Sequence, residues 1–232
     1  MKILIQTTMV LGMLLMAAFP GQAQEADSAL AAQHLERLMQ LFGEESSYEA
    51  RLSLSLYERN ANEPFRQLES HIRKDGAQLW TKQNQQEMLM NKALVIQLDR
   101  SMEVLQLSER TRDNKQATGG FEAYLELYQK ATATHEGSSD VLRLDFVDEL
   151  LYDYAEIWLD PATSAPSRMV LWSKPDPQNE RARMELQYEQ LDLQPEFDAA
   201  AFASNRYVQK NRGQYAPAAA YRNYQFIDPF TE

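Results

Sequence analysis

Residues 48–57 read YEARLSLSLY, and every second residue of this stretch, from Tyr48 to Leu56, is apolar. This period of two places all the apolar side chains on one face of a β-strand. The same alternation resumes at Leu68, Ser70 and Ile72, and Asp75-Gly76 then provides the residue types of a tight hairpin turn. The stretch therefore predicts antiparallel strands with one buried face.

Further short strands follow directly, separated by polar turns. The pattern predicts strands at Ala77–Lys82, Glu87–Met90, Ala93–Leu98 and Met102–Leu107. Connections of a few residues leave no room for crossover helices, so neighbouring strands should pair antiparallel. We expect a six-stranded meander with one apolar face, which must be covered by something.

The start of the chain has the composition of a secretory signal peptide. Met1-Lys2 precedes the apolar run Ile3–Phe19, and a small-residue ending suits cleavage after Ala23. The chain has no cysteine, so we expect neither a lipid-modified N-terminus nor disulfides. These features predict a signal peptide at 1–23, export to the periplasm, and one domain at 24–232.

The overall charge argues against some classes of partner. The chain carries 34 acidic and 23 basic residues, which gives a net charge of −11. An acidic protein is poorly suited to bind nucleic acid or anionic lipid surfaces. No internal repeat or low-complexity run marks a second domain, and we expect a monomer.

Two segments have helical periodicity. Residues 26–42 form an amphipathic pattern that ends at Gly43, a typical helix stop. A second helix is predicted over about Phe121–Thr132, because its apolar residues recur at i, i+3, i+4 and i+7. They are Phe121, Tyr124, Leu125 and Tyr128.

Strand patterns return in the second half of the chain. Four further strands are predicted at Val141–Phe146, Leu151–Leu159, Arg168–Ser173 and Ala182–Leu193. The tail from Phe197 onwards is expected to contain a short helical piece around Ala199–Ala203 and a final apolar trio, Tyr224, Phe226 and Ile227.

This order of elements resembles the outer-membrane lipoprotein carrier family, the LolA-like proteins, whose fold also serves LolB and RseB. The resemblance rests on patterns of strand and turn that cover most of the chain after residue 23. It is carried by Tyr48–Leu56, His71–Trp80, Ala93–Leu98, Met102–Leu107, Ala155–Thr163 and Pro166–Met169.

The resemblance implies a mainly β, α+β fold. An antiparallel meander would curl into an incomplete barrel, with helices covering its concave apolar face and leaving a cavity for acyl chains. The cavity candidates are Leu52, Leu54, Leu56, Ile72, Trp80, Met88, Met90, Leu94, Ile96 and Leu98. The second helix would be a lid, and Arg73 is the nearest candidate for the family's lid-holding arginine. Ordinary core packing is the alternative for all the cavity candidates.

The function implied by the resemblance is that of a periplasmic carrier shielding the acyl chains of lipoproteins in transit to the outer membrane. Its partners would be acylated lipoproteins, an inner-membrane complex that releases them and an outer-membrane acceptor. Two alternatives stay open: an envelope-stress or regulatory module of the RseB type that senses lipid, and a carrier of another hydrophobic or glycolipid cargo.

Catalytic and metal-binding patterns were not found in the sequence. His34, His71 and His135 are far apart and lack metal-ligand spacing, and no nucleophile elbow, phosphate loop or dinucleotide motif occurs. The acidic run of Asp145, Asp148, Glu149 and Asp153 is best interpreted as a solvated hairpin end. We therefore predict a protein without enzymatic activity, cofactor or metal.

Overall fold

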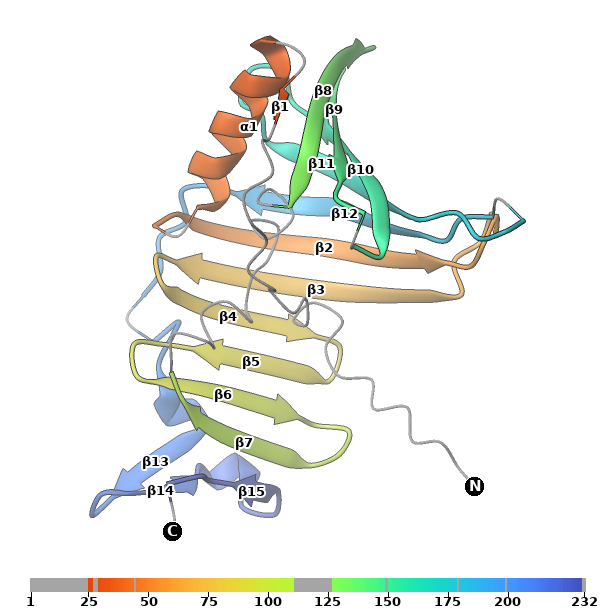
Figure 1. Ribbon diagram of the computed structural model, residues 1–232. Helices are drawn as coiled ribbons and strands as arrows, with labels where there is room; N and C mark the ends of the chain where they lie inside the picture. The colour runs from red at the N-terminus through yellow and green to blue at the C-terminus, as the bar shows by residue number, and fades with distance from the viewer. Residues whose placement is uncertain are drawn as a thin grey trace.

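The computed structural model describes residues 25–26, 29–43, 45–110, 127–148, 150–178, 180–198 and 200–230. This part of the chain is mainly β, with one large curved sheet, a separate two-stranded sheet, one α-helix and two short 3₁₀ helices (Figure 1). The large sheet has 13 strands and two free ends, so it is not closed into a barrel. The predicted incomplete barrel is confirmed at this level.

The predicted six-stranded meander is present. It consists of β2 (Ser47–Tyr57), β3 (Arg66–Asp75), β4 (Gln78–Gln83), β5 (Gln86–Met90), β6 (Leu94–Asp99) and β7 (Val104–Glu109), each antiparallel to the next. The hairpin turn between β3 and β4 contains Gly76 at a φ of 52°, a conformation that glycine adopts without strain.

A second meander follows in the chain and joins the first. It consists of β8 (Tyr128–Glu136), β9 (Ser139–Phe146), β10 (Tyr152–Leu159), β11 (Pro166–Ser173) and β12 (Arg183–Asp192), again antiparallel. Strand β12 pairs with β2, so the two meanders form one continuous sheet. The four strands predicted in this half are confirmed.

The prediction of a mid-chain helix is wrong for the residues of that segment that the structure describes. Tyr128 to Thr132, its predicted C-terminal part, belong to β8, while Phe121, Tyr124 and Leu125 lie outside the described residues. Ala131 and Ala133 alternate with Thr132 and Thr134 along β8, and threonine favours strands because its side chain is β-branched. The helical spacing of four large side chains concealed this alternation.

The one α-helix, α1 (Ala29–Phe42), ends where the sequence predicts and begins three residues later than predicted. Its buried residues lie along one stripe, and it packs against β2, β8 and the two-residue strand β1 (Glu25–Ala26). They are Ala31, His34, Leu35, Leu38 and Phe42. A Cβ atom at Gly43 would lie 2.4 Å from the carbonyl oxygen of Met39, so only glycine fits directly after the helix.

The tail adds short elements and packs on β4–β7. They are the 3₁₀ helices η1 (Ser204–Arg206) and η2 (Ala219–Tyr221), the hairpin β13 (Val208–Asn211) and β14 (Gln214–Pro217), and the parallel edge strand β15 (Gln225–Ile227) beside β7. The helical piece predicted around Ala199–Ala203 is wrong for residues 200–203, which form turns and an extended segment.

Candidate functional site

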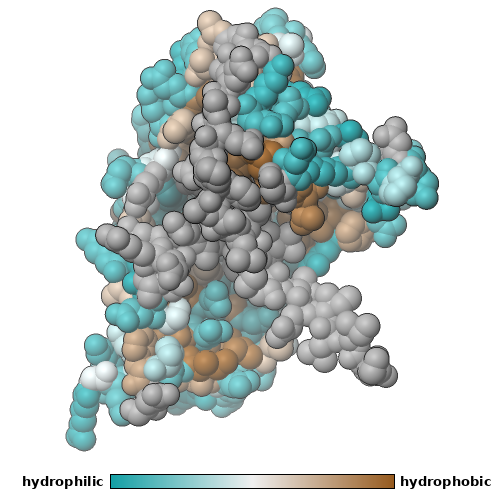
Figure 2. Space-filling view, viewed as in Figure 1, coloured by the Kyte–Doolittle hydropathy of each residue, from teal (hydrophilic) through white to brown (hydrophobic). Residues whose placement is uncertain are grey.

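The register of the strands assigns each side chain to one of two faces of the large sheet. We call the face that contacts α1 the helix face, and the opposite face, which the tail covers at β4–β7, the tail face. In β2, Ala50, Leu52 and Leu54 point to the helix face. Seen from the direction of Figure 1, hydrophobic surface is visible both near β8–β10 and over the lower strands of the sheet (Figure 2).

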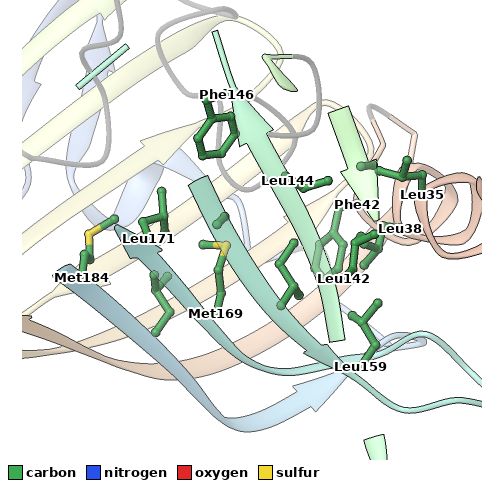
Figure 3. Close-up of a cluster of buried hydrophobic side chains, with 14 of the residues drawn as sticks. Leu35, Leu38, Phe42, Leu142, Leu144, Phe146, Leu159, Met169, Leu171 and Met184 are labelled. Carbon is green, nitrogen blue, oxygen red and sulfur yellow. The ribbon is translucent and has the colours of Figure 1, made fainter. Parts of the chain in front are cut away.

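Part of the helix face is a closed core. Leu35, Leu38 and Phe42 of α1 pack against side chains of the second meander, as Figure 3 shows (Figure 3). The labelled sheet residues of this core are Leu142, Leu144, Phe146, Leu159, Met169, Leu171 and Met184. Leu54 belongs to the same cluster and is 1% exposed. In this region the side chains therefore form an ordinary packed core, the alternative to a lipid cavity given in the sequence analysis.

A second apolar cluster lies further along the helix face, on β3–β6, beyond the strands on which α1 mainly packs. We call it the β3–β6 patch; its members are Ile72, Leu79, Met88, Met90 and Val95. Within the described part of the chain, the hydrophobic side chains grouped with this patch come from the sheet itself. Ile72 also packs against the core under α1, so the patch continues that core across the sheet.

Thr81 lies in the middle of the β3–β6 patch. In the register it stands directly opposite Ile72 of β3 and Met88 of β5, so the three side chains share one face. The Thr81 side chain is buried, and its hydroxyl oxygen has no hydrogen-bond partner in the structure as described. A buried hydroxyl without a partner costs about 1–3 kcal/mol. Such a group is unusual in a folded protein.

A row of polar side chains borders the patch on one side. Ser70, Gln83, Gln86 and Asp99 stand opposite one another in successive strands, two residues along from Thr81. They are hydrogen-bonded in pairs: Gln83 Nε2 donates to Ser70 Oγ at 3.1 Å, and Gln86 Nε2 donates to Asp99 Oδ2 at 2.9 Å. We call these four residues the polar row. On β4–β6 the helix face thus changes, along the strands, from the apolar row of Leu79, Met90 and Val95 to the polar row.

The register separates the predicted cavity residues into two groups. Six of them lie on the helix face, in the core or in the β3–β6 patch: Leu52, Leu54, Leu56, Ile72, Met88 and Met90. The other four lie on the tail face: Trp80, Leu94, Ile96 and Leu98. The four residues on the tail face therefore cannot line one cavity together with the six on the helix face. The tail-face group packs against the C-terminal tail instead.

Hydrogen bonds join the tail to that face. Trp80 Nε1 donates to Tyr207 Oη at 2.9 Å, and the Tyr207 hydroxyl donates to Glu87 Oε2 at 2.8 Å. Burial raises the pKa of Glu87, but the hydrogen bonds from Tyr207 and Arg100 outweigh it and leave the pKa below its ordinary value. Burial and the bond to Glu87 raise the pKa of Tyr207.

Arg73 does not have the position of a lid-holding arginine. It lies on the tail face, with its guanidinium 5.2 Å from the ring centroid of Trp80, and its Nε donates to Glu49 Oε1 at 2.9 Å. It therefore points away from α1. Tyr128, the one predicted lid residue that is described, is half-buried in β8 against the core, and burial raises its pKa.

A buried network connects α1 to the sheet. His34 Nε2 lies 2.8 Å from Asp140 Oδ2, and His34 Nδ1 lies 2.8 Å from Ser164 Oγ. His135 donates from Nδ1 to the other oxygen of Asp140, and this bond lowers the pKa of Asp140. The residue types are those of a hydrolase triad, but Ser164 is 0% exposed and His34 1%. No substrate can reach this serine, so the network holds the helix in place.

The acidic run has the structure predicted for it. Asp145 pairs with Arg143, Asp148 with Lys174, and Asp153 with Arg181. Its fourth member, Glu149, lies outside the described residues. Among the residues that the structure describes, no His, Asp and Glu side chains are grouped so that three could hold a metal ion. Nor does the same part of the chain contain a helix long and apolar enough to span a bilayer.

Comparison with known proteins gives no match to a family model or to a curated protein. Solved structures do match. An uncharacterized conserved protein from Thermus thermophilus aligns over 85% of this chain and 98% of its own, with 10% identity and a TM-score of 0.47. MucB aligns over 77% of this chain and 64% of its own, with 16% identity and a TM-score of 0.42.

A LolA superfamily protein from Nitrosomonas europaea aligns over 76% of this chain and 98% of its own, with 12% identity and a TM-score of 0.36. The solved structures similar to this chain thus include a member of the superfamily that its sequence pattern resembles.

Proposed function

We propose that the protein is a periplasmic carrier that holds the acyl chains of lipoproteins on the β3–β6 patch. The observation that carries this proposal is the patch itself. It is a continuous apolar strip from four adjacent strands, and the hydrophobic residues grouped with it in the described structure come from the same sheet. Leu79, Met88, Met90 and Val95 are only 5–9% exposed, so a carrier would have to open this part of the fold to bury its cargo against the strip.

The composition of the strip suits acyl chains. Met88 and Met90 have flexible, polarizable side chains that adapt to ligands of different shape. Each CH₂ group moved from water to an apolar surface contributes about 0.8 kcal/mol, so two or three chains would bind tightly without specific contacts. Ile72 packs against both the patch and the core under α1, so cargo on the patch would also lie next to that core.

Binding of a fluorescent fatty acyl probe tests this proposal. Met88→Gln keeps the length of the side chain but adds a polar amide to the strip, and we expect the affinity for the probe to fall about tenfold or more. Met102→Gln is the matched control, because Met102 is 68% exposed in the turn after β6. Absence of probe binding by the unchanged protein, or equal affinities for both variants, would contradict the proposal.

The cargo can be identified without choosing it in advance. We expect the protein purified from periplasmic extract to retain diacylated or triacylated material that mass spectrometry detects. Lipoprotein-derived acyl groups would support the carrier role, whereas glycolipid alone would point to a different cargo on the same strip.

Export is part of the same proposal. The apolar run Ile3–Phe19 and the ending at Ala23 support cleavage by signal peptidase. N-terminal sequencing of the periplasmic protein should then begin at Gln24. An intact Met1 would contradict export by this route.

A further inference from the structure

The Thr81 hydroxyl is a polar group that the fold buries without using it. Its oxygen has no partner among the described residues, and its closest cross-strand neighbours on the same face are Ile72 and Met88. The side chains of the polar row are already hydrogen-bonded in pairs, whereas Gln97, which stands opposite Met88 in the row of Thr81, is exposed. An unpaired donor in an apolar strip is complementary to an apolar ligand that contains an isolated acceptor.

We infer that Thr81 donates a hydrogen bond to the carbonyl oxygen that links an acyl chain to the rest of the cargo, in an ester or an amide. This inference rests on the proposed function, since it requires that acyl chains lie on the β3–β6 patch. Thr81 then distinguishes acylated molecules from other hydrophobic ones. A hydroxyl can donate to a carbonyl oxygen in any acyl ester or amide, so the same contact serves different cargoes.

The rows on either side of Thr81 give the cargo a direction. Leu79, Met90 and Val95 stand opposite one another in one row, and the polar row stands on the other side of Thr81. An acyl chain on Leu79, Met90 and Val95 would place its first carbonyl carbon near Thr81. The glycerol or peptide part of the cargo would then lie over the polar row, where amide and hydroxyl groups are available. Along the strands, an apolar row is followed by the buried Thr81 hydroxyl and then by the polar row. This order matches the chain, carbonyl group and head group of an acyl lipid.

The test compares an ester lipid with an ether lipid of the same chain length. The probes are dioleoylglycerol and its dialkyl ether analogue, which lacks both carbonyl groups. We expect the wild-type protein to bind the ester about five to ten times more tightly than the ether, the ratio typical of one buried hydrogen bond. In Thr81→Val the hydroxyl is replaced by a methyl group of similar size, and the two affinities should become equal through loss of ester affinity.

Two variants control the comparison. Thr81→Ser keeps the hydroxyl and should keep the preference for the ester. Thr134→Val makes the same chemical change as Thr81→Val at an exposed position of β8 and should leave both affinities unchanged. In the free protein, Thr81→Val should not lower the denaturant midpoint, because it removes a polar group that has no partner.

The outcomes separate this inference from the proposed function. If neither lipid binds the wild-type protein, the proposed function fails, and this inference fails with it. If both lipids bind equally well, or if Thr81→Val retains the ester preference, the inference is overturned while the carrier proposal stands. A lowered denaturant midpoint of Thr81→Val would also overturn the inference, because it would show that the hydroxyl already has a partner.

Discussion

The buried Tyr207 side chain hydrogen-bonds the C-terminal tail to the sheet at β4 and β5. Its hydroxyl accepts from Trp80 Nε1 and donates to Glu87 Oε2, and the whole side chain is 2% exposed. Tyr207→Phe removes both bonds and leaves two buried polar groups short of a partner. We expect the free energy of unfolding to fall by about 1–3 kcal/mol in urea denaturation. Tyr215→Phe, at a half-buried ring of the same tail, is the control and should change it little.

Glu87 makes the attachment of the tail sensitive to acid. Hydrogen bonds from Tyr207 and Arg100 outweigh burial and lower its pKa in the folded protein. A carboxyl whose pKa is lowered by folding stabilises the fold at pH values above its pKa in the unfolded chain, about 4.3. This contribution is lost as the pH falls through the pKa of the folded state. Stability measured from pH 7 to pH 3 should therefore fall on the acid side. Glu87→Gln should reduce that slope, and an unchanged slope would contradict this assignment.

The residues that matter most at this scale could not be found from the sequence. His34 bonds to partners 106 and 130 residues away, and the sequence shows it only as an isolated histidine on an amphipathic helix. Thr81 is a common strand residue, and nothing in its neighbourhood indicates an unpaired hydroxyl. The contacts of His34 depend on how α1 packs on the sheet, and the surroundings of Thr81 depend on the register of β3, β4 and β5. Neither can be derived from the local sequence.

At the scale of elements, the sequence predicts well the strands that have one polar face. For strands buried on both faces, it does not show which side chains point to which face. In β2 the alternation identifies the buried side directly. In β5 four consecutive residues are buried, and β6 begins with three. A continuous apolar run does not reveal which residues face which side, so Met88 and Ile96 were expected to share a face that they do not share.

The helix α1 gives a prediction for a whole element. His34→Ala leaves Asp140 and Ser164 buried without the imidazole that joins them, and α1 loses its polar attachment to the sheet. We expect a loss of about 2–4 kcal/mol in unfolding free energy. In the His34→Ala variant the amides of α1 should also exchange faster with solvent than in the wild-type protein, and this increase should be larger than that of the β2 amides. Gln33→Ala, one position earlier and exposed, should change neither quantity.

At the scale of the whole molecule, the two layers that cover the sheet lie on opposite faces. Helix α1 packs on the helix face at β2 and β8, and the tail packs on the tail face at β4–β7. The sheet is longer than either layer. Among the described residues, the β3–β6 patch lies beside the part of the helix face on which α1 packs, and Ile72 joins it to that core.

The two ends of the sheet are protected by segments from the two ends of the described chain. Strand β1 pairs in parallel with β8, and β15 pairs in parallel with β7. Uncovered edge strands offer free backbone groups to other chains and promote association. The short strand β15 therefore protects the fold from pairing through β7, although it adds little to the sheet itself.

Gln225→Pro tests this protection. The amide of Gln225 donates to the carbonyl oxygen of Glu103 at 2.8 Å, and proline has no amide hydrogen to replace it. We expect β15 to detach, the amides of Val104 to Glu109 to exchange faster, and the protein to associate as its concentration rises in sedimentation velocity. Gln225→Ala keeps the amide and is the control. A monomeric Gln225→Pro variant with unchanged exchange in β7 would show that the tail cluster around Tyr207, and not β15, protects this edge.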